Sequence, residues 1–164
     1  MNPDRGRLQC KKLNIYLNAD TGWIKDHVRC NEMLLDGFSV TNCDEELLDF
    51  FTTASPCTSA IYAINYDLSK VIVDLVQKFT GLKNRDEYGL VESIRGDIKD
   101  EGVVEVLKRK CAEFIAEEDQ IEEDRGTIQV IGIVNNDIGK KLTLNAKNFS
   151  YGRGSYFSIQ ISNL

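Results

Sequence analysis

The chain has 164 residues, of which 42% are hydrophobic and 28% are charged. This composition favours a single globular domain, residues 1–164, and excludes a disordered chain. The formal net charge of −6 argues against general binding to nucleic acids or anionic membranes, because such binding requires a basic face.

The cysteine pattern indicates a reducing cellular compartment. Their spacing is irregular and contains no Cys-x-x-Cys pair, which favours reduced thiols over a disulfide framework or a zinc site. The first residues form no apolar leader, and no apolar run has the length of a membrane span. We therefore expect a cytoplasmic protein that contacts no membrane and holds no metal. The five cysteines are Cys10, Cys30, Cys43, Cys57 and Cys111.

The N-terminal part of the chain predicts a loose arm followed by two helices. Residues 1–12 are polar and basic, as in an unanchored arm. Apolar residues at helical spacings predict a helix that begins near Trp23 and stops at Gly37. A second, short helix is expected to follow the acidic cap 44-DEE-46.

The central part predicts a hairpin and a connection. Residues 58–65 and 70–76 are rich in β-branched and aromatic residues, with turn residues between them, so we expect two antiparallel strands. Residues 80–100 are charged and interrupted by glycine, which indicates a surface connection with at most a turn of helix at 90–94.

The longest predicted helix covers about residues 101–118, where apolar side chains form one stripe. The acidic stretch 117-EEDQIEEDR-125 is interpreted as its solvated end. A calcium loop is the alternative, but the stretch lacks the alternating ligands and central glycine of an EF-hand.

The C-terminal forty residues predict three strands, Thr127–Val134, Lys141–Phe149 and Ser155–Ser162. The segment 135-NNDIGK-140 is a strong turn signal between the first two. The expected fold class is therefore α+β, with N-terminal helices, a β-hairpin, a long helix and a C-terminal antiparallel β-meander.

The sequence offers little catalytic chemistry. It contains no nucleophile elbow, phosphate loop, dinucleotide fingerprint or His-Glu-x-x-His motif. The single histidine, His27, lies on a predicted helix, where packing or exposure is the common role. We expect no enzyme and no cofactor. The glycines around Arg153 favour a turn or bulge between strands, or a partner contact by the arginine, over a phosphate cradle.

Several segments, in order, resemble the α-subunit of the F-actin-capping protein. The stretch 14-NIYLNADTGWIKDHV-28 is similar to that family's helix, Ala-x-x-Gly, helix opening, through Ala19 and Gly22. The stretch 66-YDLSKVIVDLV-76 resembles the family's Asp-Pro segment that leads into a strand, with leucine in place of the proline. The helix that ends near Glu118, followed by strands, has the family's order.

The most specific segment of the resemblance is 148-NFSYGR-153. Four residues match the family's Asn-Phe-Trp-Asn-Gly-Arg motif in register, and we expect them to bind a partner: Asn148, Phe149, Gly152 and Arg153. The chain stops where the family continues into a further strand and a C-terminal helix, so it would be a divergent, C-terminally shortened member.

The resemblance implies a cytoskeletal function. The chain would pair with a capping-protein β-subunit and block subunit exchange at the barbed ends of actin filaments. Two alternatives stay open. One is a small, non-enzymatic interaction module or adaptor that binds a partner through its antiparallel sheet. The other is an enzyme with a site built on Cys111 or on carboxylates near Asp119.

Overall fold

A computed structural model describes residues 6–17, 21–37, 42–52, 57–84, 91–149 and 155–164. Strands and helices alternate through the first half of the chain, and strands follow one another in the second half. None of the described helices combines the length and the apolarity that crossing a membrane requires. The elements are β1 (Leu8–Tyr16), α1 (Thr21–His27), β2 (Val28–Asp36), α2 (Asp44–Phe51), β3 (Cys57–Asp67), α3 (Ser69–Gly81), β4 (Ser93–Ile98), α4 (Val103–Lys110), the short 3₁₀ helix η2 (Ala112–Phe114), β5 (Ile115–Glu123), β6 (Gly126–Asn135), β7 (Lys140–Phe149) and β8 (Ser155–Asn163).

All eight strands belong to one mixed sheet in the order β1-β2-β3-β4-β8-β7-β6-β5. The first four strands are parallel and are joined by α1, α2 and α3. After β4 the chain runs through α4 to the far edge of the sheet. It then returns through four antiparallel strands until β8 pairs with β4.

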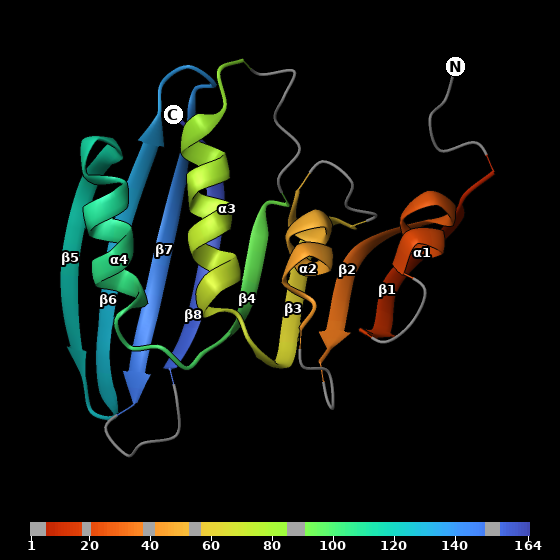
Figure 1. The fold of residues 1–164 in the computed structure, drawn as a ribbon, viewed down its shortest axis with the longest axis horizontal. Helices are drawn as coiled ribbons and strands as arrows, with labels where there is room; N and C mark the ends of the chain where they lie inside the picture. Colours follow the sequence, from red (N-terminus) through yellow and green to blue (C-terminus); the bar gives the residue numbers. More distant parts are fainter. Residues whose placement is uncertain (1–5, 18–20, 38–41, 53–56, 85–90, 150–154) are drawn as a thin grey trace.

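The helices lie on one face of this sheet (Figure 1). Each crossover from β1 to β4 steps to the next strand in the same direction, and right-handed crossovers of that kind place every helix on the same side. The helices also contact one another: the Lys25 ammonium of α1 lies 2.7 Å from an Asp49 carboxylate oxygen of α2. The opposite face carries none of the described helices.

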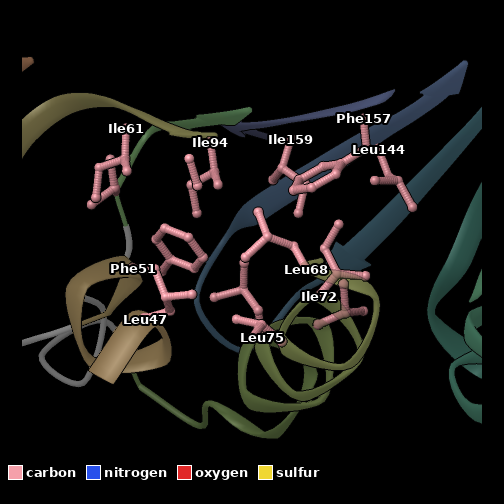
Figure 2. Close-up of a cluster of buried hydrophobic side chains, with 14 of the residues drawn as sticks. Leu47, Phe51, Ile61, Leu68, Ile72, Leu75, Ile94, Leu144, Phe157 and Ile159 are labelled. Carbon is pink, nitrogen blue, oxygen red and sulfur yellow. The ribbon is translucent and has the colours of Figure 1, made fainter. Parts of the chain in front are cut away.

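The hydrophobic core is the layer between the helices and the sheet. Helix α3 has the strongest core stripe, because its buried residues recur at helical spacing from Val71 to Phe79. Figure 2 shows side chains from the helical layer facing side chains of β3, β4, β7 and β8, among them Leu47, Phe51, Ile61, Leu68, Ile72, Leu75, Ile94, Leu144, Phe157 and Ile159. Most of the apolar burial therefore lies on one side of the sheet.

The predicted fold class, α+β with N-terminal helices and a separate C-terminal meander, is wrong. The N-terminal half is a parallel β-α-β arrangement, and its strands are continuous with the C-terminal ones in a single sheet. Residues 8–12, expected in a loose arm, are part of β1. The helix expected from Trp23 ends at His27, and residues 28–36 form strand β2. This part of the chain also departs from the helix-turn-helix opening that the resemblance implied.

Three predictions for the middle of the chain are wrong. Residues 70–76 were expected as a strand but lie in α3, because Phe79 and Thr80 extend the buried pattern with helical spacing. Residues 93–98, expected in a connection, form β4. The predicted long helix ends at Lys110, and the acidic stretch forms β5 rather than a helix end. For β4 and β5, pairing with distant strands overrides the local pattern. For α3, burial of a helical stripe overrides a strand-like composition.

Other local predictions agree with the structure. The expected short helix occurs as α2, although residues 44–46 form its first turn rather than a cap before it. Residues 58–65 lie within β3. The three expected C-terminal strands occur as β6, β7 and β8, with antiparallel pairing. Together with β5, however, they make four antiparallel strands. These strands continue the parallel half of the sheet instead of forming a separate sheet.

Candidate functional site

The sheet face opposite the helices, called the open face below, is left uncovered by the described helices (Figure 1). Its side chains can be followed in register across the whole sheet, one from each strand. The central row consists of Asn14, Leu34, Tyr62, Arg95, Ser158, Asn145, Val130 and Asp119. All eight are partly or fully exposed.

An open face is unusual for the parallel half of this sheet. Parallel strands joined by helices are generally covered on both sides, and their sequences are then continuously apolar. Here β3 alternates instead, with Ile61 and Ala63 buried and Tyr62 and Ile64 at least partly exposed. This alternation is typical of a sheet in which one face is exposed to solvent or binds another molecule.

The parallel half of the open face combines aromatic and aliphatic side chains with charged ones, among them the Lys12–Glu32 ion pair at 2.9 Å. Tyr16 is 66% exposed and Ile64 37% exposed, and Leu34 and Tyr62 are half-buried beside them. The Arg95 guanidinium lies 5.5 Å from the centre of the Tyr62 ring, a cation–π arrangement. A depression of about 220 Å³ opens between these strands, lined by Lys12, Asn14, Glu32, Met33, Leu34 and Tyr62.

The antiparallel half of the open face is tied together by ion pairs. Lys141 of β7 pairs with Glu117 of β5, and Lys147 pairs with Glu123, so each bridge passes over the strand between them. Gly132 of β6 lies under the first bridge. A Cβ there would come within 2.8 Å of Lys141 Cε and 2.9 Å of Glu117 Cβ, so the bridge needs glycine beneath it. Its charges are already satisfied within the chain.

A second candidate site is a polar crevice of about 700 Å³ outside the carboxyl ends of β3 and β4. Ligands of open α/β sheets commonly bind at this edge. Aspartates and lysines line most of it, including Asp44, Asp67, Asp74, Asp100, Lys70, Lys99 and Lys110. The crevice is therefore a mixture of opposite charges.

Asp67 and Ser69 hold the crevice wall together. One Asp67 carboxylate oxygen accepts hydrogen bonds from the Ser69 hydroxyl at 2.6 Å, the Lys99 N–H at 3.0 Å and the Ser69 N–H at 3.1 Å. The Ser69 oxygen in turn accepts the Asp100 N–H at 3.0 Å. Burial alone would raise the pKa of Asp67, but these hydrogen bonds outweigh it and lower the pKa. The two turns after β3 and β4 are joined through this pair.

The other wall is fixed in the same way. The Tyr66 hydroxyl donates to an Asp44 carboxylate oxygen at 2.6 Å and accepts the Cys43 N–H at 2.9 Å. Burial, followed by the bond to Asp44, raises the pKa of Tyr66. The hydroxyls of Ser69 and Tyr66 both donate hydrogen bonds to carboxylates that hold the crevice walls together. Neither hydroxyl is therefore positioned as a nucleophile beside a free base. The described residues also contain no cluster of three or more acidic, histidine or cysteine side chains that fits a metal ion.

Of the residues predicted to bind a partner, Asn148 and Phe149 lie at the end of β7. Asn148 pairs with Ser155 and accepts a hydrogen bond from its hydroxyl at 2.6 Å, so its side chain links β7 to β8. Phe149 ends β7, and its side chain is outside the described set. Gly152 and Arg153 lie outside the described residues. Their expected contact with a partner stays a prediction.

The residues considered for catalysis are not brought together. The exposed His27 ring stacks on Trp23 with ring centres 4.7 Å apart. Cys111 is buried at the end of α4, and burial raises the pKa of its thiol. Asp119 is exposed on β5, and its carboxylate accepts the N–H of the next residue. None of the three lines the crevice.

Sequence reasoning missed the open-face residues. Tyr62 and Arg95 lie in segments expected as a hairpin strand and as a connection. The alternation from Ile61 to Ile64 did signal a half-exposed strand. The neighbour of this strand is set by pairing between residues more than 30 positions apart, such as Tyr62 and Arg95. No local sequence pattern encodes such a pairing.

Comparisons with known proteins do not identify a family. Neither the protein-family models nor the curated proteins searched match this chain. Among solved structures, it is similar to an S-adenosylmethionine-dependent methyltransferase from Clostridium acetobutylicum ATCC 824, with 8% sequence identity and a TM-score of 0.24. That alignment covers 98% of this chain and 68% of the other. A likeness at this level supports no conclusion about function.

Proposed function

We propose that the chain is a non-enzymatic interaction module that binds a protein partner on the open face, centred on Tyr62. The observation that carries the proposal is the uncovered parallel half of the sheet. There, Tyr16, Leu34 and Ile64 join Tyr62 in a surface with a depression beside it. Tyrosine and arginine are the residues most often found at the energetic centre of protein interfaces.

The size of the face suits a protein partner rather than a small ligand. Eight strands about 4.8 Å apart and roughly 30 Å long present an area of about 1,000 Å². A standard stable interface covers about 800 Å² on each partner. The whole face is therefore large enough without the sheet edges, whereas the four parallel strands alone supply about 600 Å², so a stable partner would also contact the antiparallel half.

Matched variants test the proposal. Tyr62→Asp places a charge at the centre of the open face, and Trp23→Asp makes the same change on exposed α1, on the helical side. The tagged wild-type chain and both variants would each be used to capture binding partners from lysates of cells that naturally produce this protein. We expect Trp23→Asp to retain the wild-type partner and Tyr62→Asp to weaken its affinity by about 30-fold, or about 2 kcal/mol.

Unfolding curves in urea would first establish that both variants are folded. Retention of the same partners at wild-type affinity by folded Tyr62→Asp would overturn the proposal. Loss of binding by both variants would place the contact elsewhere, on the helical side or on both sides.

The resemblance of residues 148–153 to capping protein supplies the first named partners to test. The actin-capping hypothesis stays a prediction, and co-expression with a capping-protein β-subunit tests it. Co-purification together with slower barbed-end elongation from filament seeds would support that function. If neither occurs, the interaction module binds a different partner.

A further inference from the structure

Three cysteines lie in one row across the first three strands. In the register of the sheet Cys10 pairs with Cys30, and Cys30 pairs with Cys57. Cys30 and Cys57 are buried, whereas Cys10 is exposed. Neighbouring strands about 4.8 Å apart put paired Cα atoms within the range of about 4.4–6.8 Å that a disulfide spans.

Of the two possible pairs, the contacts favour Cys30 with Cys57. Both side chains belong to the hydrophobic core, and the Cys57 thiol donates to the carbonyl of Asn31, the residue after Cys30, at 3.1 Å. Cys10, by contrast, is exposed. The register also shifts directly after this pair, between Cys30 and Glu32. An irregularity of this kind interrupts the ladder locally and lets the two backbones adjust.

The surroundings make the two thiols chemically different. The neighbouring Cys30 thiol lowers the pKa of Cys57 to about 7, against the opposing effect of burial, and backbone hydrogen bonds at Ser59 and Ala60 add to the lowering. The neighbouring Cys57 thiol, followed by burial, raises the pKa of Cys30. Cys57 is therefore the more readily ionised of the two, and the thiolate is the form that reacts with oxidants.

We propose that Cys57 and Cys30 form a reversible oxidation site for small hydroperoxides, with Cys57 as the attacking thiol and Cys30 as the resolving thiol. The Cys57 thiolate attacks a peroxide oxygen, so an S–O bond forms, the O–O bond breaks and hydroxide or an alkoxide leaves. The Cys30 sulfur then attacks the Cys57 sulfur. The S–S bond forms, the S–O bond breaks, and the hydroxyl leaves with the Cys30 proton as water.

The electrons balance over the two steps. The two thiols lose two electrons in forming the disulfide, and the hydroperoxide gains them. Hydrogen peroxide is thereby reduced to two molecules of water, and an organic hydroperoxide to one molecule of water and one of alcohol. Because both sulfurs are buried, the site suits a small oxidant rather than a bulky disulfide. The product would join β2 to β3 covalently, and the inference does not depend on what binds the open face.

Mass spectrometry of the folded chain tests this site. The reduced wild-type chain is treated with hydrogen peroxide in native buffer, its free thiols are alkylated after denaturation, and its peptides are mapped. We expect the intact chain to lose about 2 Da before alkylation, and the peptide map to contain a linked peptide with Cys30 and Cys57. Cys43 and Cys111 should be alkylated, and dithiothreitol added before alkylation should restore the starting mass.

Single variants separate the two roles. In Cys30→Ser the sulfenic acid on Cys57 should persist and react with dimedone, whereas Cys57→Ser should give neither product. Cys111→Ser, a buried cysteine outside the row, should behave like the wild type. Should a variant fail to fold, as judged by circular dichroism, the wild-type peptide map alone decides the question.

Three results would overturn the inference. One is a Cys10–Cys30 link in place of the expected one. Another is oxidation confined to Cys10. The third is a Cys30–Cys57 link that forms only after the chain is unfolded in urea, because such a link would not depend on the folded structure.

Discussion

At the scale of single residues, Asp67 shows how a polar side chain can serve the fold at a place where catalysis is often found. It lies at the carboxyl edge of the sheet, in a crevice rich in charge. Its hydrogen bonds go to the turns that follow β3 and β4, and they lower its pKa against the effect of burial. The carboxylate therefore contributes to stability by holding two turns together.

This assignment predicts a pH dependence of stability. A carboxylate whose pKa is depressed by folding stabilises the native state above its unfolded pKa of about 4, and that stabilisation disappears as the pH falls through the folded pKa. Asp67→Asn should therefore cost about 1 kcal/mol at pH 7 and progressively less toward pH 3. Urea unfolding at a series of pH values measures the difference.

Ser69→Ala provides the matched comparison, because it removes the hydroxyl that donates to Asp67. It should reduce the same pH-dependent part of the stability. If the wild type and Asp67→Asn lose stability in parallel from pH 7 to pH 3, the stabilising role of the Asp67 charge is wrong.

At the scale of elements, β6 holds the end of α3 through one buried amide. The Asn135 side chain donates to the Phe79 carbonyl at 2.8 Å and to the Leu82 carbonyl at 2.9 Å, and its oxygen accepts the Asp137 N–H at 3.0 Å. These bonds satisfy carbonyls at the helix end and fix the turn after β6. One residue thus connects the helical layer to the sheet.

Asn135→Ala should lower the free energy of unfolding by about 2–4 kcal/mol, since it removes three hydrogen bonds and leaves buried carbonyls unsatisfied. Asn145→Ala on β7 is the control, because its amide has a single 3.5 Å contact with Ser158. It should cost less than about 1 kcal/mol. Equal effects of the two substitutions on the urea midpoint would contradict the proposed link between α3 and β6.

Element prediction succeeded where the signal was local. The acidic residues 44–46 indicated α2, of which they form the first turn, and the turn 135–140 separated β6 from β7. Element prediction failed in β5: its charge run is exposed, as expected, but it forms an edge strand whose glutamates pair with lysines of β7 across an intervening strand. It also failed in α3, because the strand-like composition of residues 70–76 hid a buried stripe that continues to Phe79.

At the scale of the whole molecule, the arrangement of the sheet could not be read from the sequence. The order of the strands depends on β4 pairing with β8, which joins residues such as Ile94 and Ile159. That contact makes one sheet from two halves and leaves one face without a described helix. The candidate site is a product of this topology rather than of any motif, and so sequence reasoning placed it at the β7–β8 turn instead.

The central claim is that the open face is occupied by another protein in the cell. Side-chain footprinting by hydroxyl radicals, read by mass spectrometry, compares the purified chain with the chain inside cells. Tyr62 and Tyr16 should be modified several-fold less in cells, while Trp23 on the helical side should be modified equally in both. Equal modification of Tyr62 and Tyr16 in the two samples would show that the open face has no protein partner there.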